Sequence, residues 1–150
     1  MDINYECITT DELLKLKKER VLNKFDLVIA SEVIEHVSNR NKFLSDIANL
    51  CRTGGVVVIT TINKSFFGIL LGKYFAENVL KIVPIGTHDV QKLVSPGSLA
   101  KDAEKHNIVL DNFVGFTPTF TFKDIMSKQL GDFKITSNIG VNYGAAGIKI

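Results

Sequence analysis

The hydrophobic pattern of the chain switches between two periods. Residues 25–30 (FDLVIA) and 56–61 (VVVITT) are nearly continuous apolar runs, which is typical of strands buried on both faces of a parallel sheet. The segment between them, residues 41–52, has apolar side chains at the spacing of an amphipathic helix: Phe43, Leu44, Ile47, Leu50 and Cys51. The pattern therefore predicts a strand, a helix and a second strand in succession.

Capping signals predict two more helices. Thr9 and Glu12 form a capping-box pattern ahead of a helix over about residues 11–20. Ser95, followed by a proline, opens another helix that Asn107 closes. Three further stretches are expected to form strands: residues 4–8, 108–116 and 142–150. Alternating strands and helices imply a single α/β domain over residues 1–150 with a largely parallel sheet.

Composition and charge restrict the classes of function. The 18 basic and 16 acidic residues leave a net charge of +2, too small to indicate a nucleic-acid-binding protein. Cys7 and Cys51 show no CxxC spacing and are expected to be reduced thiols. The first residues show neither a signal peptide nor an Arg-rich presequence.

Candidate chemistry follows the first apolar run directly. Ligands of α/β sheets bind beyond the carboxyl ends of the strands, and here the chain reads Ser31-Glu-Val-Ile-Glu-His36. If a short helix begins here, Glu32, Glu35 and His36 project from one face. Two carboxylates and an imidazole can form half of the coordination sphere of a divalent metal. The alternative is an exposed helix face with three solvated polar side chains.

Several segments together resemble the central part of class I methyltransferases, and more narrowly the ubiquinone biosynthesis O-methyltransferases. These segments are residues 25–37 (FDLVIASEVIEHV), 52–55 (RTGG), 58–63 (VITTIN), 85–90 (IGTHDV), 94–96 (VSP) and 140–143 (GVNY). The family methylates hydroxyl groups of polyprenylated catechol intermediates with S-adenosylmethionine. The resemblance covers essentially the whole chain.

The resemblance implies roles for the residues after the first apolar run. Glu32, Glu35 and His36 are expected to bind a divalent cation, with Mg²⁺ the expected ion, and Ser31 is expected to lie beside the methyl donor. A cation bound to both oxygens of a catechol lowers the hydroxyl pKa and orients the attacking oxygen.

The most hydrophobic stretch is residues 65–83, which is interpreted as an insertion facing a membrane or the substrate. Its charges, Lys73, Glu77 and Lys81, are spaced by four and form one polar stripe. This pattern fits an amphipathic helix at a membrane interface or over a greasy substrate, although a helix packed on the sheet has the same pattern. The resemblance favours membrane contact, because the family substrates carry isoprenoid tails.

Thr87, His88 and Asp89 follow that stretch. A histidine beside an aspartate can act as a general base for the hydroxyl proton. It is equally well explained as a structural hydrogen-bonded pair. His88 and Asp89 are therefore the candidate catalytic residues, with both interpretations open.

The sequence lacks the Gly-rich turn after a first strand and the acidic residue that normally binds the donor ribose. By resemblance, residues 4–8 correspond to the third family strand and residues 25–30 to the fourth. The two strands that lie between them in the family sheet are then missing. We therefore expect a partial Rossmann-like sheet, the C-terminal portion of the fold, with an open hydrophobic edge at residues 25–30.

Two functions are compatible with these features, beside a weaker third interpretation as a scaffold remnant that binds no ligand. The first is metal-assisted, S-adenosylmethionine-dependent O-methylation of polyprenylated catechols in ubiquinone biosynthesis. The second is a non-catalytic module that binds lipid or a partner protein in a quinone-biosynthesis assembly. The resemblance implies a peripheral protein on the matrix side of the mitochondrial inner membrane in a eukaryote, or on the cytoplasmic membrane surface in a bacterium.

Overall fold

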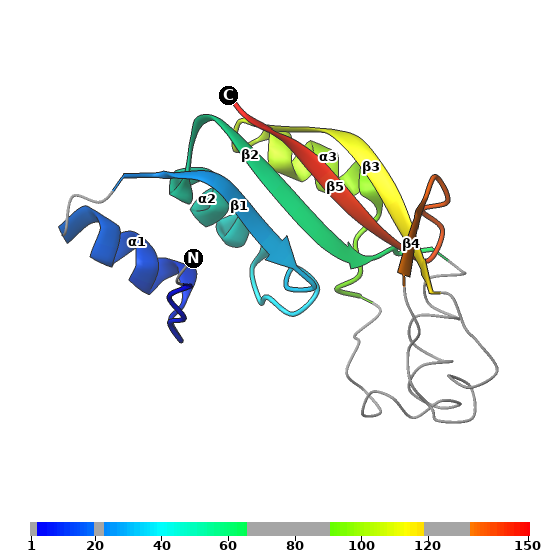
Figure 1. Ribbon diagram of the computed structural model, residues 1–150, viewed down its shortest axis with the longest axis horizontal. Coiled ribbons are helices and arrows are strands. Elements are labelled where there is room, and N and C mark those ends of the chain that lie inside the picture. The colour runs from blue at the N-terminus through cyan, green and yellow to red at the C-terminus, as the bar shows by residue number, and fades with distance from the viewer. Residues whose placement is uncertain (1–2, 20–22, 66–90, 119–132) are drawn as a thin grey trace.

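The computed structural model describes residues 3–19, 23–65, 91–118 and 133–150 (Figure 1). Within these ranges the helices are α1 (Thr10–Glu19), α2 (Arg40–Leu50) and α3 (Pro96–Glu104), and the strands are β1 (Phe25–Ser31), β2 (Cys51–Ile62), β3 (Ile108–Pro118), β4 (Phe133–Thr136) and β5 (Asn142–Lys149). The predicted α/β class is confirmed. Most predicted elements are present, with bounds that differ by a few residues.

One mixed sheet contains all five described strands in the order β1-β2-β5-β3-β4. β1 and β2 are parallel and are joined through α2. β5 inserts between β2 and β3 and runs antiparallel to both, and β4 adds antiparallel to β3. The prediction of a largely parallel sheet is therefore wrong for the described part, because the last strand returns between two strands that point the same way.

Helices α2 and α3 cover one face of the sheet (Figure 1). The α3 helix starts as predicted, with the Ser95 hydroxyl accepting the Ser98 N–H and a proline in the first turn. The core lies between these helices and the sheet and includes Leu44, Ile47, Val57, Ile59, Leu99, Ile108 and Tyr143. Burial of these side chains removes apolar surface from water and holds the two layers together.

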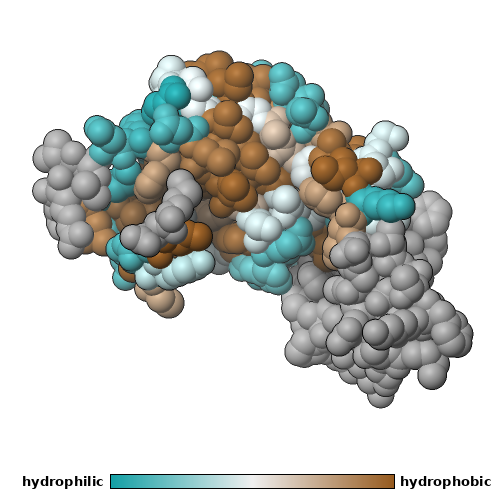
Figure 2. Space-filling model, in the orientation of Figure 1, coloured by the Kyte–Doolittle hydropathy of each residue, from teal (hydrophilic) through white to brown (hydrophobic). Residues whose placement is uncertain are grey.

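The opposite face of the sheet carries a row of exposed apolar side chains. The strand register places Leu27 beside Val56, Val56 beside Ile148 and Ile148 beside Val109. Their exposed fractions are 50%, 39%, 51% and 41% in the order Leu27, Val56, Ile148, Val109. Figure 2 shows hydrophobic side chains gathered over the middle of the molecule in the orientation of Figure 1. We call these four residues the open-face row.

Strand β1 differs from its prediction in burial. It forms the edge of the sheet, as expected, but it is not buried on both faces. Phe25, Leu27 and Ile29 alternate along it and are each at least 41% exposed. Phe25 contacts α1, where the Lys17 ammonium lies 3.7 Å from the centre of its ring, so Leu27 and Ile29 are the ones that meet solvent. The prediction of an open hydrophobic edge is confirmed.

Residues 4–8 do not form the predicted strand. They precede α1 as an exposed irregular segment, and no described strand lies beside them to provide hydrogen bonds. α1 packs against α2, where Thr10 donates a hydrogen bond to Asp46 (2.8 Å) and Lys42 pairs with Asp11 (2.5 Å). The N-terminal segment is thus attached mainly to α2, with one contact to the sheet, where Lys17 lies over the ring of Phe25.

Candidate functional site

The candidate site lies where β1 and β2 end side by side. The two strands are parallel, so the residues after Ser31 and the residues Thr60 and Thr61 lie at the same edge of the sheet. In such sheets this edge is where ligands bind.

The segment after β1 is a turn and not the short helix considered from sequence. Residues 34–36 form a single turn, in which the His36 N–H donates to the Val33 carbonyl (2.9 Å). Glu32 has a positive φ of 53°, an unusual conformation for a non-glycine residue. Its N–H donates to the Thr60 carbonyl (3.0 Å) and lies 3.2 Å from the Thr60 hydroxyl. These bonds to β2 hold the backbone outside the helical region.

Glu35 is the buried acidic residue of the site. Only 2% of it is exposed, and its Oε2 accepts a hydrogen bond from the Thr61 hydroxyl at 2.9 Å. Its Oε1 is buried and has no hydrogen-bond partner. A buried carboxylate oxygen without a partner is costly unless a proton or a cation compensates it. The Glu32 carboxyl group interacts with that of Glu35, so either a proton shared between the two or the divalent cation suggested by the sequence would compensate this atom.

Glu32 belongs to the same electrostatic group. The residue is exposed as a whole, but protein atoms crowd its carboxylate. This desolvation, followed by the negative charge of Glu35, raises the pKa of Glu32 to about 7. Two carboxylates that oppose each other's ionisation are a common feature of functional sites. We refer to Glu32 and Glu35 as the acidic pair.

The third predicted ligand is placed differently. His36 is exposed, and the described residues contain no group of three or more His, Cys, Asp or Glu side chains able to hold a metal ion. The structure thus brings together the two carboxylates of the predicted set, without convergence of all three side chains. The turn explains this, because only a helix would have placed the three on one face.

The remaining predicted residues fall into two groups. Ser31 ends β1, is exposed, and has its Oγ 3.2 Å from the hydroxyl of Thr60. His88, Asp89 and the predicted helix over residues 65–83, apart from Ser65, lie outside the described residues. Both cysteines are free thiols.

A second polar cluster at this edge was not assigned a role from the sequence. The Asn63 N–H donates to the Val141 carbonyl (2.8 Å), and its Nδ2 donates to the Ile139 carbonyl (2.7 Å). The hydroxyl of buried Tyr143 donates to the Val94 carbonyl (3.1 Å), and burial raises the pKa of this phenol. The sequence motifs at 94–96 and 140–143 are thereby joined at the end of β2. The signals in the sequence were a polar Asn directly after the apolar run of β2 and a Tyr within β5.

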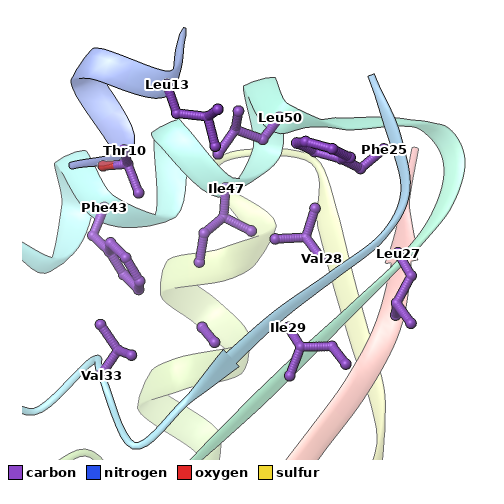
Figure 3. Close-up of a pocket in the computed structure, with 11 residues that line it drawn as sticks. Thr10, Leu13, Phe25, Leu27, Val28, Ile29, Val33, Phe43, Ile47 and Leu50 are labelled. Atoms are coloured by element: carbon purple, nitrogen blue, oxygen red, sulfur yellow. The ribbon is translucent and has the colours of Figure 1, made fainter. Parts of the chain in front are cut away.

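An apolar groove lies next to the open edge of β1. It has a volume of about 390 Å³. Figure 3 shows side chains from α1, β1 and α2 around it, including Leu13, Phe25, Val28, Phe43 and Ile47. Thr10 is the polar member of this lining. The groove is therefore suited to apolar groups and not to a charged donor.

A comparison with models of protein families identifies the family of this chain. The methyltransferase domain model matches residues 1–111. The chain belongs to this methyltransferase family. Solved methyltransferase structures share its fold: a S-adenosylmethionine-dependent methyltransferase from Thermotoga maritima (TM-score 0.54, 18% identity) matches 84% of this chain and 56% of its own. Magnesium protoporphyrin IX methyltransferase from Synechocystis PCC 6803 (TM-score 0.50, 13% identity) matches 85% and 46%.

Individual methyltransferases of similar sequence point to one group within the family. The chain is 32% identical over 143 residues to ubiquinone biosynthesis O-methyltransferase of Pelagibacter ubique, covering 95% of this chain and 54% of that protein. It is 33% identical over 147 residues to the human mitochondrial ubiquinone biosynthesis O-methyltransferase, covering 98% and 37%. The resemblance noted from the sequence motifs is confirmed. The chain spans about half or less of the length of these relatives.

None of the helices in the described ranges is long and apolar enough to cross a bilayer.

Proposed function

We propose that this chain forms the metal- and substrate-binding side of a S-adenosylmethionine-dependent O-methyltransferase that acts on polyprenylated catechols. The observation that carries the proposal is the buried, unpartnered Oε1 of Glu35 beside Glu32, at the carboxyl ends of two parallel strands. The names of the relatives support the reaction class and the ubiquinone pathway.

Each candidate residue has a role in this proposed reaction. Glu32 and Glu35 would hold the cation, with Mg²⁺ as the expected ion because hard cations prefer carboxylate oxygens. The exposed His36 would have to turn towards them to complete the predicted ligand set. When bound, such a cation lowers the pKa of a coordinated catechol hydroxyl. Ser31 lies at the end of β1, where it would face the methyl donor. His88 or Asp89 would accept the hydroxyl proton.

The chain also needs a donor-binding part. We propose that strands and helices carrying the glycine-rich donor loop add at the edge of β1 and cover the open-face row. The relatives are about twice as long as this chain or more, which supports such an additional part. Membrane contact through residues 65–83 and a mitochondrial location, as in the human relative, are further parts of the proposal.

A second candidate function is a non-catalytic module that binds lipid or a partner protein in a quinone-biosynthesis assembly. The observation that favours it is the combination of the open-face row with the 390 Å³ apolar groove. Such a module would bind partners but would not need the acidic pair. The two functions therefore differ in whether the protein needs the Glu35 carboxylate to bind its ligand.

Titration with Mn²⁺, a spectroscopic substitute for Mg²⁺, tests the proposal. The free ion is followed by electron paramagnetic resonance with wild type, Glu35→Gln, and Glu104→Gln as a matched control on an exposed position of α3. We expect Glu35→Gln to weaken binding at least tenfold and Glu104→Gln to leave it unchanged. A soluble catechol should alter the spectrum of the bound ion. Equal affinities of all three proteins would contradict the proposal and favour the non-catalytic module.

A further inference from the structure

We propose that Thr60 and Thr61, consecutive residues of β2, are positioning residues that fix the two carboxylates of the acidic pair for cation binding. This inference rests on the proposed function, because it concerns the same site. It extends that function to two hydroxyl groups that are not themselves candidate ligands.

Thr61 acts on the buried member of the pair. Both Thr61 and Glu35 are almost completely inaccessible to solvent, at 0% and 2% exposed. The Thr61 hydroxyl donates to Glu35 Oε2 at 2.9 Å, which leaves Oε1 as the unpartnered oxygen. A donor on one oxygen fixes the rotation of the carboxylate and so determines which oxygen stays available.

Thr60 acts on the backbone of the other member. The Glu32 N–H donates to two oxygens of Thr60, the carbonyl (3.0 Å) and the hydroxyl (3.2 Å). Glu32 has a φ of 53°, which an ordinary residue adopts only when its surroundings impose it. The hydroxyl also lies 3.2 Å from the Oγ of Ser31, its register partner on β1. Thr60 thus contacts the end of β1 and also holds the backbone of Glu32 in the conformation that sets the direction of the Glu32 side chain.

The arrangement follows from strand geometry. Successive side chains of a strand point to opposite faces of the sheet, so two adjacent threonines present hydroxyl groups on both sides of the end of β2. One hydroxyl reaches the buried carboxylate and the other reaches the turn. A pair of valines would have a similar shape and β propensity but would lack both hydroxyl groups, the donor to Glu35 and the acceptor of the Glu32 N–H. The hydroxyl groups, and not the shape of the side chains, therefore carry the role.

The test compares Thr→Val with Thr→Ser at each position in the full 150-residue chain, with Thr53→Val as an exposed control on the same strand. The readout is the Mn²⁺ affinity measured by electron paramagnetic resonance, and circular dichroism verifies folding. Partners that orient metal ligands typically contribute about 10- to 100-fold in affinity. We expect Thr61→Val to weaken Mn²⁺ binding at least tenfold, and Thr60→Val to weaken it measurably. Thr61→Ser should stay within about threefold of wild type, because serine keeps the hydroxyl.

Three results would overturn the inference. Thr61→Val binding Mn²⁺ as tightly as wild type would exclude positioning through the hydroxyl, while leaving the cation site intact. Thr61→Ser as weak as Thr61→Val would show that packing, and not the hydroxyl, matters. Absence of Mn²⁺ binding by wild type would overturn the cation site and the positioning role together. If Thr61→Val does not fold, the Mn²⁺ affinities of Thr60→Val and Thr60→Ser are compared instead, because position 60 is only half-buried. Equal affinities of these two variants would overturn the inference.

Discussion

At the scale of single residues, Glu32 makes the stability of this molecule depend on pH. The pKa of Glu32 is raised to about 7, mainly by desolvation and then by Glu35, from an ordinary value of 4.5. Between these two pH values the folded protein holds a proton that the unfolded chain has released. The free energy of unfolding therefore falls as the pH rises from 4.5 to 7.

Urea unfolding in the presence of EDTA tests this electrostatic interpretation. Wild type is expected to be less stable at pH 7.5 than at pH 5, and Glu32→Gln is expected to lose most of that difference because it has no proton to release. Glu104→Gln, on the exposed side of α3, should behave like wild type. An unchanged pH dependence in Glu32→Gln would show that the two carboxylates do not interact as described.

At the scale of elements, the sequence was informative wherever the signal was local. The capping box is formed, with the Thr9 N–H donating to Glu12 Oε2 at 2.7 Å, and the Ser95 cap was equally readable. β4 was missed, since Phe133–Thr136 is mostly exposed and is a strand only through pairing with β3. A short helix after β1 was considered from the sequence, and a turn forms instead because Glu32, just before it, is bonded to Thr60 of β2, 28 residues away. Non-local hydrogen bonds of this kind leave no periodic pattern in the sequence.

The pairing of β3 with β5 makes a prediction at this scale. A Cβ at Gly147 would lie 1.9 Å from the Val109 carbonyl oxygen, next to the irregular register at Leu110. Because backbone atoms cannot give way cheaply, Gly147→Ala should lower the free energy of unfolding by about 1–3 kcal/mol. Gly97→Ala, where nothing lies within 4 Å, should not lower it. Urea unfolding compares the two, and equal stability of both variants would show that β5 and β3 are not packed this closely.

At the scale of the whole molecule, the described part has helices on one face of its sheet only. The open-face row and the edge of β1 leave apolar surface exposed, and such surface marks an interface or an aggregation site. The motifs identified the family from the sequence alone, and the missing donor loop predicted the open edge. The uncovered face was not predicted, because periodicity does not tell a strand covered on both sides from one that has lost its cover.

Self-association of the chain follows from this surface. Sedimentation velocity should show oligomers of wild type at high concentration, and the double variant Val56→Thr/Ile148→Thr should shift them towards monomer, since both changes make the open-face row polar. Ile135→Thr, an exposed position on β4 outside that row, is the control and should behave like wild type. A wild-type protein that stays monomeric throughout would contradict the role of the row.

In the proposed function, this chain provides the metal and acceptor side of a methyltransferase, and a further part binds the donor. Gly54 and Gly55 lie within β2 and not in a turn between a strand and a helix, so they do not form a donor loop. Without that loop and the ribose carboxylate, donor affinity should be lower by several kcal/mol. Calorimetric titration of the 150-residue chain with S-adenosylmethionine measures this directly. We expect no binding in the micromolar range, and a micromolar dissociation constant would show that these 150 residues are sufficient to bind the donor.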